Sequence, residues 1–287
     1  MINRERSERM DNNGPIGVVD SGIGGFTVLK ALQDRLPNEN YLYFGDSMRM
    51  PYGERENDEL IMLANTIISE LENRGVKAVV LACNTLSSLI VELSARVPLF
   101  SVIEAGVQET LNWRDRGLVG LIATTATVKN RGYEKELELW TRDVEYIAQG
   151  THTLAKVIND GQGDLKILKN NIREAVEPIL IKGIKQGIVI EELLLGCTHF
   201  PIVAVTIRQM YPELELINPA NGLVRQLTKH LTEFNYFNSR DDIGSTQILT
   251  TADYDIFVRM IKELEIDCDS LEMTELHLPS TSTSVSF

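Results

Sequence analysis

Residues 16–25 read Ile-Gly-Val-Val-Asp-Ser-Gly-Ile-Gly-Gly, an apolar run that ends in a glycine-rich turn. The run over residues 16–20 predicts a buried strand, and residues 26–36 predict a helix that Pro37 ends. A buried strand, a short turn and a helix in this order are typical of a parallel sheet covered by helices. This stretch therefore predicts an α/β fold.

The same alternation continues along the chain. Residues 41–44 predict a second strand, residues 57–74 a helix that Gly75 ends, and residues 76–82 a third strand. The pattern then begins again, with strands expected at 118–124, 144–148, 192–196 and 214–217. We therefore expect two similar α/β domains with mainly parallel sheets, related by weak internal symmetry.

The order of these elements also predicts domain limits and the place of the active site. We expect a first domain over residues 15–104 plus 218–277, a second over 105–217, and disordered tails at 1–14 and 278–287. Ligands of parallel sheets bind at the carboxyl ends of strands. Four chemically useful residues follow or end predicted strands: Asp20, Cys83, Thr124 and Cys197. We interpret this arrangement as an active site in a cleft between the two domains.

Composition excludes several classes of protein. The 287 residues carry 28 Lys and Arg against 41 Asp and Glu, a net charge of −13, so no basic surface for nucleic acid is expected. The charged N-terminus lacks the apolar core of a secretion signal, and no stretch reaches the length of a membrane span. Three cysteines without CxxC spacing argue against a disulfide framework. A cytoplasmic protein is expected.

The glycine-rich turn after Asp20 has two interpretations. A dinucleotide fingerprint would need glycine where the chain has Thr27, and the Gly-Lys-Ser/Thr of a Walker loop is missing. The turn is either a tight connection that needs glycine only for its geometry, or a cradle of backbone amides that binds an anion at a helix N-terminus. Asp20 beside it favours a functional role, as a base or an orienting carboxylate.

Two cysteines lie in similar positions, each after an apolar run. Cys83 follows Ala78-Val79-Val80-Leu81-Ala82, and Cys197 follows Leu193-Leu194-Leu195-Gly196. Each precedes residues that start a helix, where the helix N-terminus is expected to lower a thiol pKa. His199 follows Cys197 closely enough to exchange protons with it. Burial as inert core residues remains the alternative, whereas a disulfide or a zinc site fits the spacing less well.

Taken together, the motifs resemble those of the cofactor-independent aspartate/glutamate racemase family, and within it the glutamate racemases. The likeness spans roughly residues 16–266. The matching segments are Asp20-Ser21-Gly22-Ile23-Gly24-Gly25, Gly45-Asp46, Pro51-Tyr52-Gly53, Cys83-Asn84-Thr85, Thr124 to Thr127, and Gly196-Cys197-Thr198-His199-Phe200-Pro201.

This resemblance implies a two-base racemase that interconverts L- and D-glutamate and supplies D-glutamate for peptidoglycan, with no cofactor and no metal. One cysteine, as a thiolate, removes the α-proton, and the other, as a thiol, delivers one to the opposite face. The family roles make Asp20 and His199 auxiliary acid–base groups for Cys83 and Cys197. The implied amino-acid-binding residues are Ser21, Pro51, Tyr52, Gly53, Asn84, Thr85, Thr127 and Thr198. A homodimer is also implied.

The chain departs from the family pattern in one segment and at two single positions. Where the family has Cys-Pro and later a glutamate near a glycine, residues 149–161 hold His152 and Asp160, either of which is a candidate for the site. Leu86 and Ala105 replace a usual alanine and a usual proline. The open alternatives are therefore a racemase of aspartate or another amino acid, and an inactive two-domain protein that binds or regulates.

Overall fold

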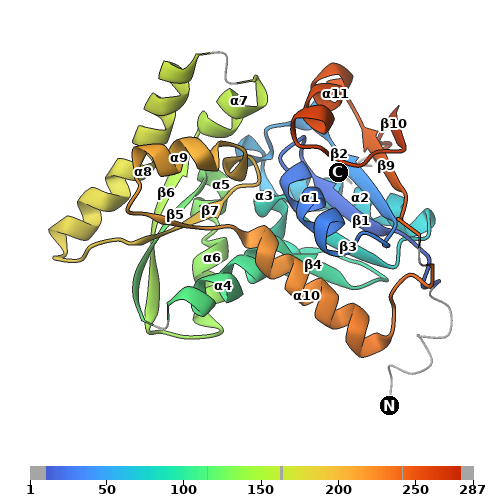
Figure 1. The fold of residues 1–287 in the computed structure, drawn as a ribbon, viewed down its shortest axis with the longest axis horizontal. Coiled ribbons are helices and arrows are strands. Elements are labelled where there is room, and N and C mark those ends of the chain that lie inside the picture. Colours follow the sequence, from blue (N-terminus) through green and yellow to red (C-terminus); the bar gives the residue numbers. More distant parts are fainter. Residues whose placement is uncertain (1–10, 115, 162–163, 241, 279–287) are drawn as a thin grey trace, which may run out of the picture.

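The computed structural model describes residues 11–114, 116–161, 164–240 and 242–278. These residues form two parallel sheets, each flanked by helices, that lie side by side (Figure 1). The predicted α/β class with mainly parallel sheets is confirmed. Of the tail expected at 278–287, all but Leu278 lies outside the described residues.

The first sheet is built mostly from the N-terminal part of the chain and extended by the C-terminal part. Its strand order is β10-β9-β2-β1-β3-β4, with all neighbours parallel. The strands are β1 (Ile16–Asp20), β2 (Tyr41–Gly45), β3 (Ala78–Leu81), β4 (Leu99–Ser101), β9 (Thr246–Thr250) and β10 (Ser270–Met273). β4, β9 and β10 were not expected from the sequence.

Helices cover both faces of this sheet because alternate strand residues point to opposite sides. One face packs against α1 (Phe26–Arg35), α10 (Pro219–Phe234) and α11 (Tyr254–Glu263). The other packs against α2 (Asn57–Asn73) and the short α3 (Asn84–Ser87). The predicted apolar face of α2 is buried, and Gly75 follows its end with a positive φ of 79°.

The second sheet has the strand order β6-β5-β7-β8, again parallel. Its strands are β5 (Gly117–Thr124), β6 (Val144–Thr151), β7 (Glu192–Gly196) and β8 (Glu215–Ile217). One face packs against α7 (Leu154–Asn159), α8 (Leu165–Lys185) and α9 (Ala204–Met210), and the other against α4 (Val102–Trp113) and α6 (Gly132–Glu138). Short α5 (Thr125–Lys129) follows β5.

The two sheets repeat one topology. The run β2-β1-β3-β4 in the first sheet has the same order as β6-β5-β7-β8 in the second. If the strands of each unit are numbered along the chain, both units have the spatial order 2-1-3-4. In such sheets the strand order reverses between the first and third strands, and ligands bind at the carboxyl ends there. Cys83 and Cys197 follow the third strand of their units, which makes their positions equivalent.

Helix α4 joins the two halves. Val102 and Ala105 pack in the core of the first sheet, whereas Ile103 and Val107 pack in the core of the second. α4 also packs against α10, where Gly222 allows close approach to the Ala105 carbonyl. The proposed domain limits at 104/105 and 217/218 therefore fall at these two helices, and they stay a prediction.

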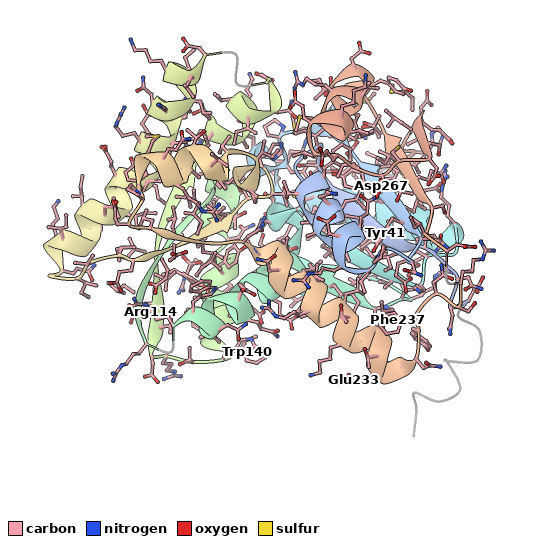
Figure 2. The ribbon with its side chains drawn as sticks, in the orientation of Figure 1. Tyr41, Arg114, Trp140, Glu233, Phe237 and Asp267 are labelled. Atoms are coloured by element: carbon pink, nitrogen blue, oxygen red, sulfur yellow. The ribbon has the colours of Figure 1, made fainter. Side chains whose placement is uncertain are left out.

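Side chains show the same division. Figure 2 shows Arg114 and Trp140 on the half with the second sheet, and Tyr41 and Asp267 on the half with the first. Arg114, just after α4, forms ion pairs with Glu191 at 2.6 Å and with Glu192 at 2.8 Å. These pairs tie the end of α4 to the beginning of β7.

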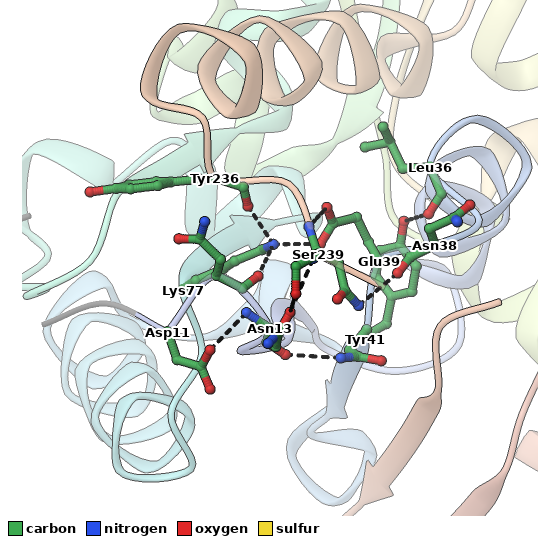
Figure 3. A network of polar contacts seen from close by, with 12 residues as sticks. Asp11, Asn13, Leu36, Asn38, Glu39, Tyr41, Lys77, Tyr236 and Ser239 are labelled. Carbon is green, nitrogen blue, oxygen red and sulfur yellow. Dashed lines mark hydrogen bonds and ion pairs between the residues drawn. The ribbon is translucent and has the colours of Figure 1, made fainter. Parts of the chain in front are cut away.

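A buried ion pair anchors the N-terminal segment. Lys77 lies 2.5 Å from Glu39, and both side chains are almost fully buried (Figure 3). The Lys77 ammonium also donates to the carbonyls of Asn12 and Tyr236, each at 2.7 Å. Asn12 falls inside the tail of residues 1–14 that we expected to be disordered, so the described part of that tail is instead bound to the first half. Its earlier residues lie outside the described ones.

Candidate active site

A cavity of about 340 Å³ lies between the two halves, at the carboxyl ends of the strands. Predicted site residues in its wall are Ser21, Pro51, Tyr52, Gly53, Cys83, Asn84, Thr85, Cys197, Thr198 and His199. Wall residues that the sequence did not place in the binding set are Ser47, Met50, Glu54, Thr124, Ala155, Lys156, Asn159, Asp160, Asp253 and Ile256. Both sheets therefore contribute to one site, as predicted.

Both thiols are free, buried and in this wall. Cys83 is the residue before α3, and its Sγ lies 4.0 Å from Ser21 Oγ. Cys197 Sγ lies 3.8 Å from His199 Nδ1. Both cysteines line the one cavity, each from a different half. Such a pair can act on opposite sides of one bound carbon atom.

The expectation of lowered thiol pKa values is wrong for this structure. Burial raises the pKa of Cys83 to about 12, and the Asp20 carboxylate adds to the shift. The backbone amides of Leu86 and Thr85 lower it, as a helix N-terminus should, but by less than burial raises it. Burial also raises the pKa of Cys197. α3 spans only four residues, which limits what its N-terminus can contribute.

Asp20, a predicted catalytic residue, is not in the cavity wall; it connects the two halves through Thr198, which is. It is fully buried at the end of β1. One carboxylate oxygen accepts a hydrogen bond from the Gly22 amide at 2.9 Å, and the other accepts one from the Thr198 hydroxyl at 3.0 Å. Burial raises the pKa of Asp20 to about 6 against these two stabilising bonds. After burial, the Asp20 carboxylate also contributes to the raised pKa of both Cys83 and Cys197.

His199 is held as a neutral imidazole. Burial lowers its pKa to about 4, and no residue in the described chain satisfies its Nε2 by a hydrogen bond. The ring lies against the glycine-rich turn, where a Cβ on Gly24 would come within 2.5 Å of both His199 Nδ1 and Thr198 Oγ1. The turn thus needs glycine here so that the two halves can meet.

Asn84 lines the cavity and has a buried amide donor without a partner in the described chain. The Tyr133 hydroxyl donates to its Oδ1 at 2.6 Å, which fixes the amide with Nδ2 as the free group. Nδ2 is buried and has no hydrogen-bond acceptor among the described residues. A buried donor of this kind is costly unless something accepts its hydrogen bond. A carboxylate is a suitable acceptor.

Hydroxyl groups line the side next to Asn84. Thr85 Oγ1 lies 3.2 Å from Thr124 Oγ1, which in turn lies 2.9 Å from Thr127 Oγ1. Thr127 is buried behind Thr124 and is not in the wall, so it positions Thr124 in this structure. Thr124 ends β5 as its position predicted, and it lines the cavity where the family resemblance implied Thr127.

The Pro-Tyr-Gly segment closes another side. Tyr52 is buried, and its hydroxyl donates to Asp46 at 2.8 Å. Asp46 also accepts from Arg49 at 2.7 Å and from Thr251 at 2.8 Å. The Tyr52 hydroxyl is therefore already engaged, and the segment offers the cavity its backbone and the ring. Gly53 packs against Thr124 of the other half.

The departing segment 149–161 reaches the site through α7. Asp160 is in the wall, whereas His152 is exposed and bonds Thr125 at 3.3 Å outside it. Lys156 and Asn159 were missed, because only the folding of α7 over the end of β6 shows that they face the cavity. Asp253 and Ile256 were missed with β9, the strand that precedes them.

Among the described residues, no cluster of three or more histidine, cysteine, aspartate or glutamate side chains has an arrangement that holds a metal ion. None of their helices has both the length and the apolar character needed to span a bilayer.

Comparison with known proteins agrees with this geometry. Residues 27–227 match the family model described as Asp/Glu/Hydantoin racemase. Glutamate racemase 1 of Caldanaerobacter subterraneus subsp. tengcongensis is 33% identical over 272 residues, which cover 93% of this chain and 100% of that protein. A glutamate racemase from Thermoanaerobacter pseudethanolicus is 33% identical over 87% of this chain and 92% of its own length.

Solved structures give the same result. Glutamate racemase isoform RacE1 from Bacillus anthracis superposes with a TM-score of 0.84 at 25% identity, over 94% of this chain and 100% of that one. Glutamate racemase from Francisella tularensis, solved in complex with D-glutamate, gives 0.82 at 30% identity, over 93% and 99%. The resemblance seen in the sequence motifs is thereby confirmed. The chain belongs to the Asp/Glu/hydantoin racemase family.

Proposed function

We propose that this protein is a glutamate racemase that interconverts L- and D-glutamate by proton transfer between two thiols and Cα. The observation that carries the proposal is the pair Cys83 and Cys197, at equivalent positions of the two halves and in the wall of one cavity. The product D-glutamate serves peptidoglycan synthesis, in keeping with the family.

Charge supports an amino acid as the substrate. The α-ammonium group of such a substrate is positively charged, and near the sulfurs it lowers both thiol pKa values. The free Nδ2 of Asn84 and the hydroxyl groups of Thr85 and Thr124 suit the α-carboxylate. These neutral donors also stabilise the charge that develops when Cα loses its proton.

A second carboxylate on the substrate also has a suitable partner. Lys156 is the only lysine or arginine in the cavity wall as far as the described residues show, and the protein around it is strongly acidic. An ammonium at the mouth attracts a dicarboxylic amino acid that the net charge of −13 would otherwise repel. Glu54, Asp160 and Asp253 share the wall with Lys156, so the choice of glutamate rests on the relatives named above.

In the proposed reaction, the thiolate of one cysteine takes the α-proton from one face. The thiol of the other gives its proton to the opposite face, so the enzyme ends with the two protonation states exchanged. Neutral His199 lies beside Cys197 and can pass a proton to or from it. Asp20 has no direct bond to Cys83 in the described chain. Its carboxylate accepts from the Gly22 amide and the Thr198 hydroxyl, so its role is to position Thr198 in the cavity wall.

The decisive experiment is incubation of the purified protein with L-glutamate in deuterated water. We expect deuterium at Cα and loss of optical rotation with no added cofactor. If only aspartate is racemised, the substrate is aspartate and not glutamate. If neither amino acid gives deuterium at Cα or loss of optical rotation, the alternative of an inactive binding or regulatory protein is favoured. The implied homodimer and cytoplasmic location rest on the family resemblance. Light scattering after size-exclusion chromatography measures the molar mass and so tests the homodimer.

A further inference from the structure

We infer that Arg259 is a positioning residue that holds α7 of one half against α11 of the other and so keeps the substrate cavity closed. This inference rests on the proposed function in its kinetic part only. Both helices line the cavity: α7 supplies Lys156 and Asn159, while Asp253 and Ile256 belong to the beginning of α11. In Figure 1, α7 and α11 face each other across the boundary between the halves, away from the α4–α10 pair that joins them.

A hydrogen bond joins α7 to α11 across this boundary. Arg259 Nη2 donates to the backbone carbonyl of Asn159 at 2.9 Å, between residues 100 positions apart in the chain. Asn159 is the last residue of α7, and the carbonyls of a last helical turn have no partner within their helix. A cation is favoured there, because the helix dipole places partial negative charge at that end.

The Arg259 guanidinium group packs against Gly161 after α7 and lies near Glu263 on its own helix. Gly161 has a positive φ of 95°, and a Cβ there would lie 2.7 Å from Arg259 Nη1, so the guanidinium group packs where a side chain would stand. On its own helix, Arg259 Nε lies 3.8 Å from the Glu263 carboxylate, which orients the side chain. We call Arg259, Asn159 and Gly161 the clasp.

The clasp bears directly on the substrate because Asn159 is shared. Its carbonyl accepts from Arg259, and its buried side chain lines the cavity together with Lys156, one turn earlier. Arg259 itself is not in the wall and touches no reacting atom. Its loss should therefore loosen α7 and weaken substrate binding, while the thiols on β3 and β7 keep their places.

The test compares Arg259→Ala, Arg259→Lys and wild type as full-length protein. Arg173→Ala is the matched control, because Arg173 forms an i,i+4 ion pair with Glu177 on the exposed face of α8 and neither residue lines the cavity. We expect Arg259→Ala to raise KM for glutamate about tenfold, the size of one lost charge-assisted hydrogen bond, with kcat within about threefold of wild type. Arg259→Lys keeps a donor without the planar fork and should fall between.

A second readout needs no turnover. Hydrogen–deuterium exchange of the α7 amides should be faster in Arg259→Ala and unchanged in Arg173→Ala, with α8 unaffected in both. Unchanged α7 exchange and KM in Arg259→Ala would overturn the inference, as would kcat and melting temperature falling together at constant KM. If wild type turns over no glutamate, the proposed function fails, and the exchange result still decides the clasp. Should the alanine variant not fold, Arg259→Lys carries the same comparison.

Discussion

Cys83 and Cys197 should each be indispensable for racemisation. Replacing either with alanine removes an acid or a base from one face of the substrate, a contribution of about 10²–10⁴ in rate. We expect racemisation of glutamate, followed by circular dichroism, to fall by at least about a hundredfold in Cys83→Ala and in Cys197→Ala. Cys268→Ala is the control, since Cys268 is half-buried outside the cavity and donates to the Ser270 carbonyl. A variant of either wall cysteine with wild-type turnover would contradict the mechanism.

The buried Asp20 carboxylate destabilises the folded state, by an amount that depends on pH. Its pKa rises from 3.8 to about 6 on folding, so the unfolded chain loses this proton first as pH increases. The folded state is therefore progressively destabilised between these values, by ~3 kcal/mol once pH exceeds about 6. Asp20→Asn should be more stable than wild type at pH 7.5, and the difference should vanish near pH 4.

Urea unfolding of wild type and Asp20→Asn at several pH values measures this difference. The same variant should also lower racemase activity, because it removes the charge that accepts the hydrogen bond of Thr198 in the cavity wall. Equal stability of the two proteins at pH 7.5 would mean that the hydrogen bonds from Gly22 and Thr198 offset the burial of the carboxylate fully.

Between elements, the glycine-rich turn before α1 packs against the Cys197 segment of the other half. Gly24→Ala would push His199 and Thr198, whose atoms lie within 2.5 Å of the new Cβ. Displacing these groups should lower kcat/KM about a hundredfold, since small misplacements of catalytic groups have effects of that size. Gly17→Ala is the control: its Cβ crowds Leu71 in the core of the first half, 3.0 Å away, and should reduce stability while kcat/KM stays intact.

How much was predictable differs between elements for physical reasons. β1 and β7 were placed to the residue, because fully buried parallel strands leave continuous apolar runs. β4 has three residues, and β10 is a half-exposed edge strand, so neither carries such a run. β9 reads Thr-Gln-Ile-Leu-Thr, and its strand character depends on pairing with β2.

The same limit applies to the site. Its motif residues at the ends of β1, β3 and β7 follow from topology, because the carboxyl ends of parallel strands meet at one edge. The wall residues of α7 and α11 do not, since they reach the cavity only through contacts such as that of Arg259 with Asn159. The thiol pKa values also required the fold, because the degree of burial that raises them is not visible in the local sequence.

The whole molecule should unfold as one unit although it holds two sheets. α4 places Val102 and Ala105 in one core and Ile103 and Val107 in the other, so neither core can open without disturbing this helix. Trp113 is the last residue of α4, and Trp140 lies on the half with the second sheet, so tryptophan fluorescence reports on these two places. Far-UV circular dichroism reports on all helices. The two signals therefore separate the second half from the entire chain.

We expect thermal unfolding curves from tryptophan fluorescence and from far-UV circular dichroism to coincide, with equal calorimetric and van't Hoff enthalpies. Val107→Ala should shift both curves down together, since truncating a buried valine in the second core costs on the order of 1–3 kcal/mol. Val91→Ala is the control, because Val91 is 91% exposed and should leave both curves in place. A fluorescence transition that moves alone in Val107→Ala would show that the half with the second sheet melts independently, and that α4 connects the halves without coupling their stability.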